Sequence, residues 1–276
     1  MPFASEVSTL MRSVAEAAVM PRFRRLAAHE VMEKSPGELV TAADLEAERR
    51  LTDGLSALCP EARIIGEEAA AENPRLLDGV GEGLLWLIDP VDGTGNFAAG
   101  REPFGMMVAL VESGVTLAGW ILAPTSGRLC HAEQGAGASM NGKRITGLAG
   151  LRDKPKAALG THFLTADRRN RVHAVAERAL DVRPVPRCAA ESYARLALGK
   201  DDVALFQRTL PWDHAAGVLF LREAGGKVTD WQGADWRVGT TAPGILAGAT
   251  GLAWQAGADA LLTPEAGLIE LENCLS

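Results

Sequence analysis

The sequence predicts a mixed chain of the α/β and α+β classes, built in two halves, and two patterns carry this prediction. In the first half, two helical segments precede a run of mostly antiparallel strands. In the second half, short apolar runs alternate with helical segments, which is typical of a layered α/β unit. The charged, proline-bearing stretch 152–155 separates the two patterns. We therefore expect an N-terminal half at 1–150 and a C-terminal half at 151–276.

Two helices open the first half. Val7, Leu10 and Val14 recur at helical spacing, which predicts an amphipathic helix over residues 5–30 that Pro21 kinks or splits. A second helix is predicted over residues 41–58, where Thr41 and Asp44 fit a capping box at its start.

Short strands follow the second helix. They are predicted at 62–65, 84–88, 106–111, 116–122, 128–133 and around Ala138. Ser113-Gly114 is expected to join two of them by a turn, and Asn141-Gly142 is a strong hairpin signal.

Strands and helices alternate in the second half. Strands are predicted near Ala157, Val185, Val228 and Ile245 and at 203–206, and helices at 167–180, 191–198, 212–224 and 252–262. The sequence contains no internal repeat and no low-complexity tract that would disturb this pattern.

Composition and charge narrow the choice of partner. Apolar residues make up 47% of the 276 residues and charged residues 23%, which is ordinary for a globular protein. A formal net charge of −7 repels nucleic-acid backbones unless a basic patch or a metal offsets it. The aromatic residues, with a single tyrosine, are also too few for a base-stacking surface. We therefore expect no nucleic-acid partner.

The cysteines indicate a reducing compartment. Cys59, Cys130, Cys188 and Cys274 form no C-x-x-C pair, so neither a zinc site nor a thioredoxin-like motif has support. The N-terminus lacks the pattern of a signal peptide. No apolar run approaches the ~20 residues that a membrane-spanning helix needs. The expected location is the cytoplasm, away from membranes.

Segment 89–97, with the sequence DPVDGTGNF, is the sharpest chemical signal. It follows an apolar strand, and its carboxylates Asp89 and Asp92 lie three residues apart on a glycine-containing turn. Together with the Val91 carbonyl they can converge on one cation, and hard oxygen donors of this kind suit Mg²⁺. The alternative is an aspartate-rich turn at a strand end, which is common.

Three further acids have both a functional and a purely structural interpretation. Glu67 follows the apolar run 62–65, so it too stands at a strand end. Asp213 opens a predicted helix, where an acid also interacts favourably with the helix dipole. For Asp44, the structural interpretation is that its carboxylate serves only the capping box of its helix. Lys34 is expected to be an ordinary surface lysine.

Taken in order, these segments resemble the magnesium-dependent, lithium-sensitive inositol monophosphatase family over nearly the whole chain. The resemblance rests on Leu39-Val40-Thr41 leading to Asp44, on Gly66-Glu67-Glu68, on segment 89–97 and on Trp212 through Gly217. The segments 89–97 and 212–217 are highly specific. The resemblance implies a layered α/β/α/β/α sandwich and a homodimer.

The resemblance also implies a role for each matching residue. Two or three Mg²⁺ ions would be bound by Glu67, Asp89, the Val91 carbonyl, Asp92 and Asp213. Catalysis of water attack on the phosphate, in line and without a phosphoenzyme, would involve Asp44, Thr94 and Glu67. The substrate would contact Gly93, Thr94, Arg187, Cys188, Ala189, Phe206 and Asp213.

The implied function is hydrolysis of a small phosphorylated metabolite, in the manner of inositol-1-monophosphatase. Relatives act on inositol phosphates, fructose bisphosphate, histidinol phosphate or 3′-phosphoadenosine nucleotides, and these alternatives stay open. Inositol-specific relatives carry a glutamate six residues before the motif tryptophan, where this chain has Phe206. Inositol 1-phosphate is therefore expected to be a mediocre substrate. A regulatory binding protein with a dead site is disfavoured because all the carboxylates and Thr94 are present.

Other phosphate-handling motifs fail on single residues. Segment 137–143 matches a nucleotide P-loop, but Arg144 stands where Ser or Thr should reach Mg²⁺. Asp89 and Asp92 are spaced too widely for an aspartyl-phosphate enzyme, and no cysteine is followed by arginine at the spacing of a cysteine phosphatase.

Overall fold

The computed structural model describes residues 3–35, 37–147 and 150–268. The helices are α1 (Ala4–Val14), α2 (Ala42–Leu58), α3 (Glu67–Glu72), α4 (Thr94–Ala98), α5 (Ala166–Ala179), α6 (Ala189–Ala197), α7 (Pro211–Glu223) and α8 (Gly251–Leu261). Short π or 3-10 turns are η1 (Ala15–Val19), η2 (Ala28–Glu30) and η3 (Pro74–Leu77). The strands of the first half are β1 (Val31–Ser35), β2 (Glu38–Thr41), β3 (Arg63–Gly66), β4 (Leu84–Asp92), β5 (Gly105–Glu112), β6 (Val115–Ala123), β7 (Arg128–Glu133), β8 (Gly137–Met140) and β9 (Lys143–Ile145). Those of the second half are β10 (Lys156–Leu159), β11 (Asp181–Arg183), β12 (Val203–Phe206), β13 (Lys227–Asp230) and β14 (Ile245–Gly248).

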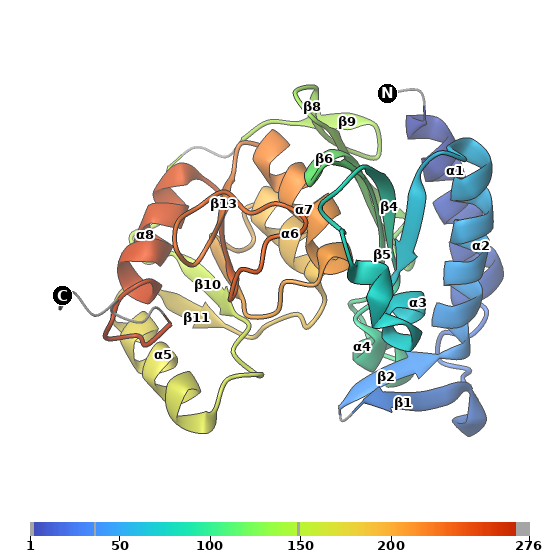
Figure 1. Cartoon of the computed structure of the whole chain (residues 1–276). Coiled ribbons are helices and arrows are strands. Elements are labelled where there is room, and N and C mark those ends of the chain that lie inside the picture. The colour runs from blue at the N-terminus through green and yellow to red at the C-terminus, as the bar shows by residue number, and fades with distance from the viewer. Residues whose placement is uncertain (1–2, 36, 148–149, 269–276) are drawn as a thin grey trace.

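Helices and sheets alternate in layers (Figure 1). Across the picture, α1 and α2 cover one face of a sheet, α6 and α7 lie between this sheet and a second one, and α5 and α8 cover the far face. The layered α/β/α/β/α sandwich that the family resemblance implies is therefore confirmed.

The two sheets differ in size and direction. The first has the order β3-β4-β5-β6-β7-β8-β9 and is antiparallel except for the pair β3–β4. The second has the order β11-β10-β12-β14-β13, with β10 parallel to both of its neighbours. The sheets divide at the expected boundary, whereas α6 and α7 of the second half pack against the first sheet. A division of the chain at residue 150 stays a prediction.

Three apolar cores fill the spaces between the layers, and β4 shows how one strand serves two of them. Leu85 and Leu87 belong to the core around α6 and α7, while Trp86 and Ile88 belong to the core under α1 and α2. Because side chains alternate along a strand, burial on both faces requires the continuous apolar run seen in the sequence.

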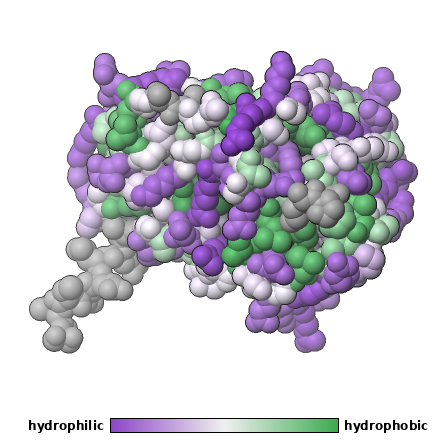
Figure 2. All heavy atoms as spheres, turned by 90° about the horizontal axis from the view of Figure 1, so that it is seen from above, coloured by the Kyte–Doolittle hydropathy of each residue, from purple (hydrophilic) through white to green (hydrophobic). Residues whose placement is uncertain are grey.

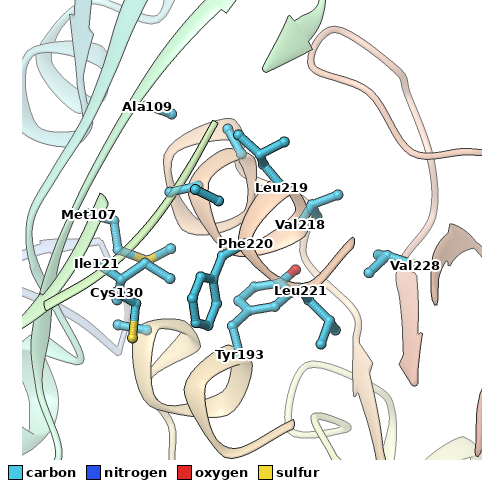
Figure 3. Packing of buried hydrophobic residues seen from close by; sticks show 14 of the residues in the cluster. Met107, Ala109, Ile121, Cys130, Tyr193, Val218, Leu219, Phe220, Leu221 and Val228 are labelled. Carbon is cyan, nitrogen blue, oxygen red and sulfur yellow. The ribbon is translucent and has the colours of Figure 1, made fainter. Parts of the chain in front are cut away.

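Helix α7 lies at the centre of the largest core. Figure 3 shows Phe220 of α7 and Tyr193 of α6 side by side, with Met107 and Ile121 of the first sheet on one side and Val228 on the other. Both rings are fully buried. Helix α7, whose first turn carries Asp213, is therefore held between the two sheets.

Two sequence predictions need correction. The first helical segment ends with η1 at Val19 and does not continue to residue 30, because Pro21 has no N–H to extend it. Strands β1 and β2, which the sequence analysis did not predict, follow this segment and pair antiparallel. The strand expected near Val185 lies earlier, in β11, since Pro184 and Pro186 flank Val185 and cannot donate to a sheet.

The surface mixes polar and apolar residues. On the face seen in Figure 2, hydrophilic side chains project around the outline and apolar ones gather in patches between them. Among the described residues, no helix combines the length and apolar character that crossing a membrane requires. Cys59, Cys130 and Cys188 are buried free thiols, while Cys274 lies outside the described residues.

We predict that Gly217→Ala destabilises the fold. Alanine normally favours a helix over glycine by about 1 kcal/mol. A Cβ at Gly217, however, would lie 2.0 Å from Cδ2 of the buried Tyr193 ring. Overpacking of this kind typically costs about 1–3 kcal/mol, so the free energy of unfolding in urea should fall by about 2 kcal/mol.

The matched control is Gly251→Ala at the start of α8. A Cβ at Gly251 meets no atom within 4 Å, so this variant should unfold at the wild-type urea concentration or above. Equal midpoints for the two variants would contradict the packing argument.

Candidate active site

Strand ends and one helix start bring the predicted acids to a single pocket. Strands β3 and β4 are parallel neighbours, with Gly66 opposite Ile88, so Glu67, which follows β3, and Asp89, which lies in β4, are side by side. Asp213 joins them from the first turn of α7. The pocket has a volume of about 520 Å³ and is also lined by Val91 and Asp92.

Three of these carboxylates form a tight group. Oxygen atoms of Glu67, Asp89 and Asp213 all lie within 4.8 Å of one another. Burial raises the pKa of Asp89 well above its ordinary value, and the neighbouring charges of Glu67, Asp92 and Asp213 raise it further. Burial, followed by Glu67 and Asp92, likewise raises the pKa of Asp213. The arrangement disfavours its own ionised form and so calls for a compensating cation.

The donor set fits a hard divalent cation. Asp89 Oδ1 is buried and has no hydrogen-bond partner among the described residues. An orphaned buried carboxylate oxygen is costly unless it is protonated or ligates a metal. The group Glu67, Asp89 and Asp213 supplies only carboxylate oxygens, the ligand type that Mg²⁺ takes.

Asp92 connects the two halves of the chain. Its Oδ2 accepts hydrogen bonds from the Ala190 N–H at 2.6 Å and the Cys188 S–H at 3.0 Å, at the start of α6. Burial raises the pKa of Asp92, although these hydrogen bonds oppose the shift. Asp92 lies outside the group of three, and its tie to α6 fixes the orientation of its carboxylate.

The turn after Asp92 requires glycine. Gly93 has φ = +84°, and a Cβ there would lie 3.2 Å from both the Cys188 Cβ and the Pro103 carbonyl oxygen. The Asn96 amide donates to the carbonyls of Pro103 and Pro186 at 2.8 and 3.0 Å. These contacts hold Gly93 and the following N–H groups at the pocket wall.

Thr94 stands between the pocket and Asp44. Its Oγ1 lies 3.2 Å from Asp44 Oδ1 and 3.0 Å from the Val91 carbonyl oxygen. Asp44 also completes the capping box of α2 with Thr41, as its structural interpretation predicts. Burial raises the pKa of Asp44 to about 6, although the hydrogen bonds from Thr41 oppose the shift. Asp44 does not line the pocket and reaches it only through Thr94.

Lys34 is not the ordinary surface lysine that the sequence led us to expect. Its Nζ lies 2.6 Å from Glu67 Oε1 and 3.0 Å from both carboxylate oxygens of Glu68. Burial lowers the pKa of Lys34, but the two carboxylates outweigh this effect and raise it. Burial and the nearby Glu67 raise the pKa of Glu68 to about 8, with Lys34 opposing the shift. Lys34 contacts Glu67 across 33 residues of sequence, so no local pattern marks the contact.

Glu48 is a further residue that the sequence analysis missed. Its carboxylate accepts the backbone N–H groups of Glu68 and Ala69, each at 2.8 Å, and so holds the start of α3 in place. A Cβ on Gly66 would lie 2.2 Å from the Glu48 carboxyl carbon, so only glycine fits there. Glu48 stands one helical turn after Asp44, and this spacing is the signal that could have found it.

The predicted substrate-side residues also meet at this pocket, which is lined by Arg187, Cys188, Ala189 and Phe206 among others. Phe206 stacks on Tyr193 with ring centroids 5.1 Å apart. His214 is buried, with Nδ1 2.9 Å from the Tyr193 hydroxyl and Nε2 2.7 Å from the Arg208 carbonyl oxygen. Burial lowers the pKa of His214 to about 4, so the neutral ring joins α6, α7 and the loop before α7.

Comparisons with known proteins agree with this fold and site. The model of the "Inositol monophosphatase family" matches residues 4–265. An inositol-1-monophosphatase of Bacillus subtilis is 33% identical over 202 residues, which cover 72% of this chain and 75% of that protein. A histidinol-phosphatase of Chlorobaculum parvum is 34% identical over 208 residues, which cover 74% of this chain and 77% of that protein.

A solved structure extends the likeness to three dimensions. The IMPase of Thermotoga maritima matches with a TM-score of 0.79 and 27% identity, covering 97% of this chain and all of that one. The family match spans nearly the whole chain, and the two curated relatives described above are named as phosphatases. The predicted enzyme class is thereby confirmed, and the chain belongs to the inositol monophosphatase family of phosphatases.

Proposed function

We propose that this protein hydrolyses phosphate monoesters of small metabolites with the help of two or three Mg²⁺ ions. The ions would be held by Glu67, Asp89, the Val91 carbonyl, Asp92 and Asp213. The observation that carries the proposal is the buried, unpartnered Asp89 Oδ1 beside the carboxylates of Glu67 and Asp213 in the described part of the chain. Three acids in so small a volume are stabilised by divalent cations far better than by any contact that the fold provides.

Bound Mg²⁺ would supply electrostatic stabilisation of the phosphoryl group and a more acidic water. The chain's own residues do the positioning. The backbone N–H groups of Gly93 and Thr94 are suited to hold phosphate oxygens, as turn nests do. The Thr94 hydroxyl would orient the attacking water and accept its proton while donating its own to Asp44 Oδ1, which lies 3.2 Å away. Glu67 would share in holding this water.

We further propose that the protein acts in the cytoplasm as a homodimer. The buried free thiols of Cys59, Cys130 and Cys188 agree with a reducing compartment. The dimer rests on the family resemblance, and light scattering of the purified protein tests it.

The direct test of the function is release of phosphate from p-nitrophenyl phosphate. Release should require Mg²⁺ and stop when EDTA is added. A protein that binds phosphate esters in Mg²⁺ but releases no phosphate would instead favour the regulatory, non-enzymatic alternative.

We predict that Asp89→Asn abolishes turnover and leaves the fold intact. The change removes one charge from a group of mutually repelling carboxylates, so the metal-free variant should unfold at or above the wild-type temperature. Mg²⁺ should raise the melting temperature of the wild type and not that of the variant, because only the former binds it tightly. Turnover above about a tenth of wild type, a loss of less than ~1.4 kcal/mol, would refute the assignment. The exposed Asp259→Asn is the matched control and should retain full activity.

We also predict that Thr94→Ala lowers kcat by about 100-fold or more, while Thr94→Ser stays within about tenfold. Alanine removes the hydroxyl that links the pocket to Asp44, and serine keeps it. Because the loss concerns proton transfer, KM for the ester should change little in either variant. Steady-state kinetics on one substrate measures both constants. Equal kcat for the alanine and serine variants would exclude a role for the hydroxyl.

A further inference from the structure

Part of the pocket wall is basic. His162, Arg187 and Arg208, here called the basic wall, line the same pocket as the carboxylates. We propose that the basic wall binds a second anionic group of the substrate, so that the enzyme prefers phosphate esters that carry a second phosphate. This inference rests on the proposed phosphatase function and specifies its substrate class.

Arg187 is a residue of the basic wall that is unpaired in the described part of the chain. Its side chain has neither a hydrogen bond nor an ion pair with any described residue, and it is exposed at the pocket. Its backbone has φ = +55°, a conformation that is strained for arginine and that glycine adopts freely. A strained arginine with no structural contact to justify it points to a role for the guanidinium itself.

Arg187 lies beside the turn that we propose to hold the reacting phosphate. Its carbonyl oxygen would lie 3.3 Å from a Cβ on Gly93, so the two backbones are in contact beside the phosphate-binding turn. His162, Arg187 and Arg208 line the same pocket, where burial and, after it, the charges of both guanidinium groups lower the pKa of His162. The two arginines therefore act on one region of the pocket.

The two arginines differ in how much positive charge they offer. Arg208 forms an ion pair with Glu38 of β2 and lies over the Phe163 ring at 4.9 Å, so its charge is largely matched. Arg187 has no carboxylate against it among the described residues. In a chain of net charge −7, an unmatched guanidinium at the pocket is suited to a phosphate, which it can bind through two hydrogen bonds.

Aromatic residues make up the neighbouring surface. The hydrocarbon ring of Phe206 offers no hydrogen-bond acceptor to a hydroxyl. It packs on Tyr193 and on His214. Phe163 is half exposed and its ring lies 4.1 Å from that of His162. This wall therefore provides charge and ring faces, and a volume of about 520 Å³ accommodates a bisphosphorylated sugar or nucleotide.

The test compares esters that differ only in the second phosphate. The value of kcat/KM is measured for 3′-phosphoadenosine 5′-phosphate against adenosine 3′-phosphate, and for fructose 1,6-bisphosphate against fructose 1-phosphate. In the wild type at least one bisphosphate should exceed its partner about tenfold or more. Arg187→Gly should lower the ratio of kcat/KM for a bisphosphate to kcat/KM for its monophosphate partner about tenfold, to near one.

Glycine is the chosen substitute because it relieves the positive φ, so loss of folding is not expected. The matched control is Arg24→Gly, since Arg24 also has a positive φ of 61° but does not line the pocket. This variant should keep the wild-type preference for bisphosphates.

Two outcomes would overturn the inference. One is a wild type that prefers neither bisphosphate. The other is an Arg187→Gly variant that loses both members of a pair equally, which would mean that Arg187 holds the scissile phosphate. If no ester is hydrolysed, the proposed phosphatase function is refuted, but binding of a second anionic group by the basic wall is not. Dissociation constants of the same pairs, measured by calorimetry in Mg²⁺ without turnover, then decide the inference in the same way.

Discussion

Mutual repulsion among buried carboxylates is the constraint on which the rest of this molecule depends. Glu67, Asp89 and Asp213 bring oxygen atoms within 4.8 Å of one another, and Asp89 is almost fully buried. Nothing in the described part of the fold neutralises Asp89 Oδ1. A packed protein adopts such an arrangement only if surrounding contacts hold it or a ligand compensates it.

The surrounding contacts are spread through the layers. Glu48 of α2 holds the start of α3, and with it Glu67, through two backbone N–H groups. The start of α6 holds Asp92, and the packing of α7 between the two sheets holds Asp213. Each carboxylate is thus positioned by a different element, which is why the site needs the whole sandwich and not one half of it.

Chemistry and specificity are carried by different parts of the same pocket. Glu67 follows β3, and Asp89 and Asp92 lie in the last part of β4, where the backbone is rigid and the geometry is set by sheet register. Arg187 stands on the segment between β11 and α6, and Phe206 ends β12. A change in this second group would leave the proposed metal ligands in place, so members of one family can keep a common reaction and differ in substrate.

The sequence by itself determined most of the helices and strands and pointed to the acids that meet at the pocket. Apolar runs that end in Glu67 or Asp89, and a helix that opens with Asp213, are local patterns, and local patterns survive without knowledge of the fold. Prediction failed where a distant contact decides the outcome. The hairpin β1–β2 brings Lys34 to Glu67, and a ring of α6 excludes a side chain at Gly217. Tertiary structure alone also decided three features of the site. Asp44 is linked to the pocket by Thr94, Asp92 is held by the start of α6, and the Arg187 side chain has no partner among the described residues. Each of these depends on residues far apart in the chain, whose distances are set by how the layers pack.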